Sequence, residues 1–125
     1  MYSRIVVGTD GTDRSLIAVD HAARLAAAFA AELHVVAAAR LTDASAKIAA
    51  KIAHDVSKRH GVRVVEHPKV GEPAPVLIAV ADAVDADLIV VGNRRAAGDA
   101  RATIGSVSSL LTHRCGRPLL LVHTG

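Results

Sequence analysis

The sequence predicts an α/β domain, a doubly wound five-stranded parallel sheet with helices on both faces, of the Rossmann-like kind. Short apolar segments alternate with longer amphipathic ones from end to end. Hydrophobic residues make up 51% of the 125 residues and aromatic residues only 2%, an aliphatic bias that suits a parallel sheet buried on both faces. No linker, repeat or low-complexity tract interrupts the pattern, so residues 1–125 are predicted to form a single domain.

The first strand is predicted over Arg4–Thr9, an apolar run that ends at the turn Asp10-Gly11. Either Thr12 or Asp13 caps the helix that follows, because both side chains can accept a hydrogen bond from a free backbone N–H. The apolar positions of this helix recur at helical spacing: Leu16, Val19, Ala23, Ala26 and Ala30. That spacing places them on one face, which predicts a helix packed against the sheet.

The middle of the chain repeats the strand-and-helix pattern. The second strand is predicted over Leu33–Ala39 and the second helix over Thr42–His60, with Gly61 placed to end that helix. The third strand is predicted over Val62–Val70. The third helix is predicted over Pro73–Val84, since a proline costs nothing in a first turn, where backbone N–H groups have no helical partner.

The last three elements are predicted over Asp87–Val91 (strand), Ser106–Arg114 (helix) and Leu119–Val122 (strand). Open parallel sheets bind ligands beyond the carboxyl ends of their strands, where the strand order reverses. The loops Thr9–Asp13 and Gly92–Gly105 are therefore expected to converge on one crevice, although the pattern does not give the strand order itself.

The second of these loops has the features of an anion site. Gly92 ends a buried strand, and Gly105-Ser106 opens a helix. Free backbone N–H groups and the positive end of the helix dipole then point into the crevice. The chain after Leu88 holds five arginines against the single acid Asp99: Arg94, Arg95, Arg101, Arg114 and Arg117. A phosphorylated small molecule fits this pattern, and a solvated basic face is the other interpretation of the charges.

Several classes of function are disfavoured. The net charge is +3 with both signs interspersed, aromatic residues are scarce and no recognition helix is evident, so no nucleic-acid partner is predicted. The apolar runs are too short to span a membrane and no signal peptide is seen, so a cytoplasmic protein is predicted. His113 and Cys115 supply too few ligands for a metal, and Cys115 is expected to be a buried small hydrophobe.

Five segments carry a resemblance to a known family. They are Ile5–Gly11, Gly71–Pro73, Ala86–Gly92, Gly105–Ser108 and Arg117–Val122. In this order and spacing the chain resembles the universal stress protein family, in its small, single-domain, nucleotide-binding form. The resemblance implies the fold of that family, a role in the stress response and a homodimer. The dimer would form by antiparallel pairing of Leu119–Val122 with the same strand of a second subunit.

The ATP-binding members of that family share a Gly-x2-Gly-x9-Gly-Ser/Thr signature, from which this chain departs once. Gly92 matches the first glycine and Gly105-Ser106 the last pair, but Arg95 stands at the middle glycine. A side chain there hinders close approach of the backbone to a phosphate. Either the Arg95 guanidinium contacts the phosphate instead, or the loop shifts so that Gly98 takes the tight turn.

The resemblance implies further roles at matching positions. Asp10 would lie beside the nucleoside, Ala38 would border the adenine, and Val91 and Gly92 would line the ribose–phosphate path. Residues 105–108 would bind phosphates through backbone N–H and hydroxyl groups. The nucleotide-binding residues predicted in this way are Gly8, Thr9, Asp10, Ala38, Val91, Gly92, Arg95, Gly105, Ser106, Val107 and Ser108. Capping of the first helix, or acceptance of hydrogen bonds from local N–H groups, is the alternative role for Asp10.

The leading hypothesis is a ligand-responsive signalling protein that binds ATP, or AMP or cyclic AMP, with or without Mg²⁺. The first alternative is a dimeric scaffold that has lost ATP binding, which the arginine at position 95 favours. The second is a slow ATPase, with Asp10 as the acid that holds a metal. No hydrolase, kinase or dehydrogenase motif is present, so no catalytic residue is assigned. A flavodoxin-like carrier is disfavoured because Tyr2 and Phe29 lie outside both loops.

Overall fold

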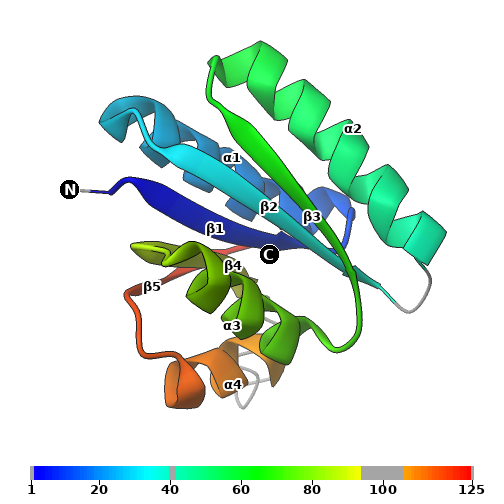
Figure 1. The fold of residues 1–125 in the computed structure, drawn as a ribbon, viewed down its shortest axis with the longest axis vertical. Helices are drawn as coiled ribbons and strands as arrows, with labels where there is room; N and C mark the ends of the chain where they lie inside the picture. The colour runs from blue at the N-terminus through cyan, green and yellow to red at the C-terminus, as the bar shows by residue number, and fades with distance from the viewer. Residues whose placement is uncertain (1, 40–41, 94–105, 125) are drawn as a thin grey trace.

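Five strands and four helices alternate along the chain in a computed structural model, which describes residues 2–39, 42–93 and 106–124 (Figure 1). In chain order the elements are β1 (Arg4–Thr9), α1 (Asp13–Phe29), β2 (Glu32–Ala39), α2 (Thr42–His60), β3 (Val64–Val70), α3 (Pro73–Val84), β4 (Leu88–Asn93), α4 (Ser106–Arg114) and β5 (Leu119–His123). The predicted alternation of strand and helix is therefore confirmed.

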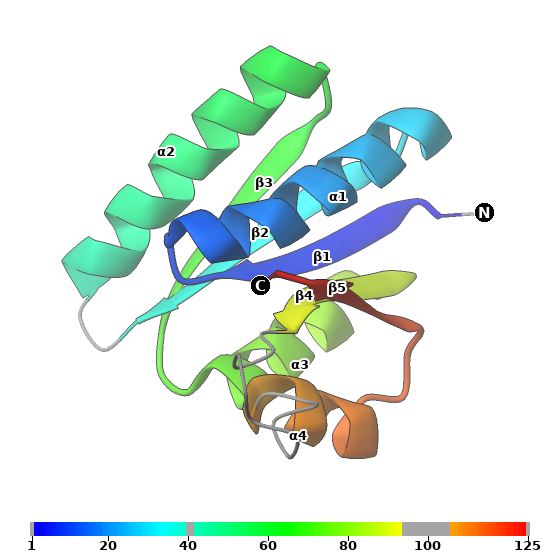
Figure 2. The same ribbon diagram turned by 180° about the vertical axis from the view of Figure 1, so that it is seen from behind.

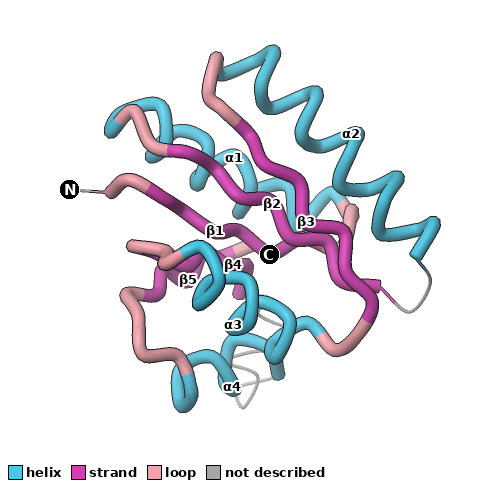
Figure 3. Tube along the Cα trace, viewed as in Figure 1, coloured by secondary structure: helices cyan, strands magenta, loops and turns pink. Residues whose placement is uncertain are grey.

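The strands form one parallel sheet in the order β3-β2-β1-β4-β5 (Figures 1 and 3). The chain first adds strands outward from β1 to β3, then crosses over to the other side of β1 and adds β4 and β5. The order thus reverses between β1 and β4. The ends of these two strands border the crevice at which such sheets bind ligands.

Helices cover both faces of the sheet, as predicted. α1 and α2 lie on one face and α3 and α4 on the other, which the two opposite views show (Figures 1 and 2). Successive β1 residues alternate between the two cores: Ile5 and Val7 pack with α1 and α2, and Val6 packs with α3 and α4. Because both faces are buried, the strands read as continuous apolar runs.

Short side chains set the distance between α1 and the sheet. Ala18, Ala22 and Ala26 recur every four residues, and each is fully buried at 0% exposure. Residues at this spacing lie on one face of a helix. Since a methyl group is the whole side chain, the backbone of α1 approaches the strands closely.

The ends of the helices follow local chemistry. Of the two predicted caps for α1 the structure selects Thr12, whose side-chain oxygen accepts a hydrogen bond from the Ser15 backbone N–H at 3.3 Å. Gly61 ends α2 as predicted, with a φ of +67° and its N–H donating to the carbonyl of Ser57. Pro73 begins α3, as its missing N–H favours.

Two strand starts were predicted too early. Val62 and Asp87 precede β3 and β4 instead of beginning them. Val62 is buried before its strand starts. The Asp87 carboxylate accepts hydrogen bonds from the backbone N–H groups of Ser3 (2.6 Å) and Arg4 (2.9 Å), which hold the pKa of Asp87 below its ordinary value. Asp87 therefore lies just before β4 and accepts hydrogen bonds from the residues at the start of β1. The sequence alone does not distinguish this role from that of the first residue of a strand.

Other boundaries differ by one or two residues. Ala30 is not part of α1 but follows it in the left-handed conformation, with a φ of 53°, and so ends the helix. β2 starts one residue early at Glu32, β4 continues to Asn93 and β5 to His123. The extra residues pair along the sheet, Asn93 opposite His123, and such pairing depends on a neighbouring strand that no local pattern shows.

Candidate functional site

A cavity of about 540 Å³ opens at the carboxyl ends of β1, β2 and β4 and is closed by the starts of α1, α3 and α4. We call it the strand-end pocket. Seven of its lining residues are among the predicted nucleotide-binding residues: Gly8, Thr9, Asp10, Ala38, Val91, Gly92 and Val107. The convergence of the β1–α1 turn with the end of β4 is as the sequence predicts, and binding of a nucleotide there stays a prediction.

The wall formed by the β1–α1 turn is held by its own hydrogen bonds. The hydroxyl groups of Thr9 and Ser15 lie 2.6 Å apart, and the Gly11 N–H donates to Thr9 Oγ1 at 3.1 Å. Gly11 has a φ of +82°, which only a glycine adopts at little cost. The turn is therefore fixed in shape before any ligand arrives.

Asp10 accepts local hydrogen bonds, one of the alternative roles expected for it, while the cap of α1 is Thr12. Its Oδ1 accepts hydrogen bonds from the Thr12 backbone N–H (3.0 Å) and from Thr12 Oγ1 (2.6 Å). Burial raises the pKa of Asp10, but the hydrogen bonds from Thr12 and Ser15 outweigh it and leave the pKa below its ordinary value. Asp10 is thus a carboxylate at neutral pH that fastens the turn and lines the pocket.

Two glycines keep the strand ends open. A Cβ added at Gly8 would lie 2.9 Å from Leu77 Cδ1, and one added at Gly92 would lie 2.8 Å from Thr124 Cγ2. Both distances are shorter than side chains tolerate. The pocket therefore depends on the absence of side chains at these two positions.

Of the remaining predicted residues, Ser108 is described in full and is not among those that line the pocket. Ser108 is 1% exposed, and its hydroxyl donates to the Gly92 carbonyl at 3.3 Å, which fastens α4 to β4. Ser106 is the first residue of α4. Arg95, Gly98 and Gly105 lie outside the described residues, so the loop that carries the signature departure is not placed.

Sequence reasoning missed eight lining residues: Thr12, Asp13, Arg14, Ser15, Val36, Pro73, Leu77 and Thr124. Thr12 and Asp13 belong to the loop that was expected to border the crevice, and Arg14 and Ser15 come next in the first turn of α1, so their place in the sequence was a usable signal. Leu77 and Thr124 carried no local signal, because α3 and the end of β5 reach the pocket only through the tertiary fold.

The lining divides into an apolar side and a polar side. Val36, Ala38 and Leu77 offer aliphatic surface from β2 and α3, while Asp10, Asp13 and Arg14 bring charge from the β1–α1 turn and the start of α1. Across the described ranges, no group of three or more His, Cys, Asp or Glu side chains is arranged to hold a metal ion. The arrangement is suited to a ligand with one flat apolar part and one polar part.

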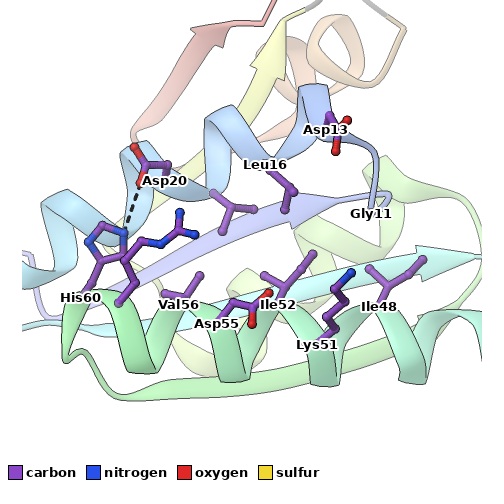
Figure 4. A pocket seen from close by; sticks show the side chains of 12 residues that line it. Gly11, Asp13, Leu16, Asp20, Ile48, Lys51, Ile52, Asp55, Val56 and His60 are labelled. Carbon is purple, nitrogen blue, oxygen red and sulfur yellow. Dashed lines mark hydrogen bonds and ion pairs between the residues drawn. The ribbon is translucent and has the colours of Figure 1, made fainter.

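A second hollow, of about 200 Å³, lies between α1 and α2 (Figure 4). We call it the α1–α2 cleft. Leu16, Ile48 and Ile52 form its apolar floor, and the Asp20–His60 contact closes one end, with Oδ1 and Nε2 3.1 Å apart. Asp13 lines both this cleft and the strand-end pocket, so the β1–α1 turn stands between the two.

The fold and the pocket together define a class, that of doubly wound α/β proteins with a ligand site where the strand order reverses. A family model described as the Universal stress protein family matches residues 1–123. The chain therefore belongs to the universal stress protein family, as the resemblance of its sequence indicates.

Individual universal stress proteins are also similar to this chain. The universal stress protein Rv1636 of Mycobacterium tuberculosis is 37% identical, over 98% of this chain and 97% of that protein. A solved structure of a universal stress protein in complex with cAMP is 37% identical with a TM-score of 0.86, over 99% of this chain and 98% of the other. A universal stress protein from Archaeoglobus fulgidus in complex with dAMP matches in fold, at 23% identity and a TM-score of 0.77, over 97% and 98% of the two chains.

Proposed function

We propose that the strand-end pocket binds an adenine nucleotide, and that its occupancy is what this protein signals in a stress response in the cytoplasm. The observation that carries the proposal is the pocket itself, which lies at the β1–β4 reversal of a chain 37% identical to a protein solved with cAMP. Seven of the residues that the family resemblance assigns to the nucleotide line it.

The dimensions and chemistry of the pocket support this ligand. Its volume of about 540 Å³ lies within the range of small-molecule sites. The adenine would lie against Val36, Ala38 and Leu77, and the ribose and phosphate would extend past Gly92 toward the start of α4. The free N–H groups of a helix N-terminus favour an anion there. AMP, cyclic AMP and ATP, with or without Mg²⁺, all share these parts.

Calorimetric titration with adenosine, AMP, cyclic AMP, ADP and ATP tests the proposal. The unaltered protein is expected to bind at least one of the nucleotides. Gly92→Val is expected to abolish binding, because its Cβ would overlap Thr124 and its methyl groups would project into the pocket. Gly116→Val is the matched control, since a Cβ at Gly116 meets no atom within 4 Å. No heat of binding with any of the five ligands would overturn the proposal.

The same titration, together with a measurement of ADP released from ATP, separates this proposal from its two alternatives, the scaffold and the slow ATPase. Arg95 stands where the family signature has a glycine, so a scaffold that has lost binding is expected to regain it in Arg95→Gly and to show none before. A slow ATPase is expected to release ADP steadily from ATP over hours. Binding of nucleotide without release of ADP supports the leading proposal over both.

We also propose a homodimer that forms through β5. This strand lies at the edge of the sheet, next to β4 alone among the described strands. Its apolar residues Leu119, Leu120 and Leu121 are only half-buried, and an open apolar edge invites pairing with a second chain. Sedimentation equilibrium is expected to give twice the mass of 12.9 kDa, and a monomer at all concentrations would exclude the dimer.

A further inference from the structure

The strand-end pocket is lined by a basic side chain that is not part of the family signature. Arg14 lines the pocket from the first turn of α1 and is exposed. Arg24, Arg63 and Arg117 each form ion pairs with carboxylates. Within the part of the chain that the structure describes, the Arg14 guanidinium pairs with no carboxylate, so it is available to a ligand.

The position of Arg14 on α1 indicates which side of the pocket it serves. A Cβ added at Gly92 would lie 3.8 Å from the Ala18 Cβ, so this face of α1 meets the end of β4. Arg14 is four residues before Ala18 and therefore lies on the same face, one turn nearer the pocket. This helical spacing puts Arg14 on the Gly92 side of the pocket.

The N-terminus of α4 borders the same side. Val107, in the first turn of α4, lines the pocket together with Gly92. Arg14 and the start of a helix thus approach one region, where the ribose and phosphate of the proposed ligand would lie. An arginine offers two parallel N–H donors to phosphate oxygens, and the helix start offers free backbone N–H groups.

Charge gives a second argument. Asp10 and Asp13 line the pocket as well, and two carboxylates repel an anion. Arg14 is the one basic side chain among the described lining residues. An anionic ligand therefore needs this cation more than it would in a neutral pocket.

Helix stability does not explain an arginine at this position. A positive charge in the first turn opposes the helix dipole, whose positive end lies there. The helix dipole therefore gives no reason for an arginine at this position, whereas a place in the lining of the pocket does.

We propose that Arg14 binds the phosphate group of the nucleotide and so sets the preference of this protein for phosphorylated over unphosphorylated nucleosides. This inference rests on the proposed function of the strand-end pocket. It adds to that function a phosphate-binding residue outside the family signature and a rule for which ligands are favoured.

Titration of Arg14→Ala with AMP, cyclic AMP and adenosine tests the inference. We expect the affinity for AMP and cyclic AMP to fall about tenfold, equivalent to about 1.4 kcal/mol, and that for adenosine to stay unchanged. Added salt should weaken AMP binding less in Arg14→Ala than in the unaltered protein, because screening acts on the charge that the variant lacks. The matched control Arg24→Ala, on the same helix and paired with Asp20, should bind as the unaltered protein does.

The melting temperature without ligand distinguishes binding from a structural role. Since Arg14 opposes the helix dipole, Arg14→Ala should melt at the same temperature or slightly higher. Equal losses of affinity for adenosine and AMP, no loss for either, or a lower melting temperature would overturn the inference while leaving nucleotide binding intact. An unaltered protein that binds no nucleotide would instead overturn the proposed function.

Discussion

The strand-end pocket and the α1–α2 cleft lie on opposite sides of the β1–α1 turn but are built differently. The first is bounded by strand ends and is open because Gly8 and Gly92 carry no side chains. The second lies between the side chains of two helices, and the hydrogen-bonded contact between Asp20 and His60 closes one end of it (Figure 4). A hollow set by the backbone persists when side chains rotate, whereas one between helix faces depends on their rotamers.

The leucines that line the two hollows give the largest expected difference. Leu77 of the strand-end pocket is 2% exposed, and Leu16 of the α1–α2 cleft is 38% exposed. We expect Leu77→Ala to lower the free energy of unfolding by about 3 kcal/mol, because it leaves a cavity under β1. Leu16→Ala should cost less than about 1 kcal/mol. Urea denaturation measures both, and equal costs would show that the two walls are packed alike.

The wall shared by the two hollows is tested at Gly11. Its φ is +82°, and an added Cβ would lie 3.0 Å from Ile48 Cγ1. We expect Gly11→Ala to destabilise the fold by about 2 kcal/mol, from backbone strain together with this contact. In the control Gly61→Ala, with a φ of +67° and no atom within 4 Å of an added Cβ, only the strain of about 1 kcal/mol remains. The difference between the melting curves isolates the contact with α2.

The charged end of the cleft should matter less. Asp20 contacts His60 (3.1 Å) and Arg24 (3.0 Å), and its own side chain is 34% exposed. Asp20→Ala is expected to cost about 1 kcal/mol of stability and to leave the affinity for nucleotide unchanged. A loss of affinity in this variant would show that the cleft and the strand-end pocket are coupled through α1.

The smallest expected effect is a pH dependence that arises outside both hollows. His67 on β3 lies 2.8 Å from His34 on β2, measured between Nε2 and Nδ1. Burial, followed by the charges of His34 and Lys69, lowers the pKa of His67 from its ordinary 6.5. The unfolded chain then binds more protons, so stability should decline as the pH falls below about 6.5. His67→Gln should flatten this decline, and the exposed His54→Gln should not.

Local sequence signals predicted the order and type of the elements well. The apolar runs of β1 and β4 are local features and lie within the predicted strands, and the cap at Thr12 is one of the two that were expected. Val62 and Asp87 were assigned to strands because strand pairing, not local composition, decides where a strand starts. The strand order was not predictable either, since it follows from how the helices pack.

The site was predictable only in part for a related reason. Gly8, Asp10 and Gly92 stand at strand ends, which sequence patterns reveal. Leu77 reaches the pocket across the sheet by packing on Gly8, and Thr124 reaches it from the far end of the chain. Ser108 seemed to be a phosphate ligand from its place at a helix start, whereas its buried hydroxyl bonds to Gly92. Which face of α4 turns toward the sheet is decided by tertiary packing, so the sequence at the start of this helix does not reveal it.

Three of the four buried alanines of α1 bear on how this protein tolerates mutation. Ala18, Ala22 and Ala26 act as spacers of fixed thickness between helix and sheet. A valine at Ala22 would push α1 away from the sheet and lower the free energy of unfolding by about 1–3 kcal/mol. It would also displace the start of α1, where Asp13 and Arg14 lie. The geometry of the strand-end pocket is therefore sensitive to substitutions two turns away, in residues that do not line it.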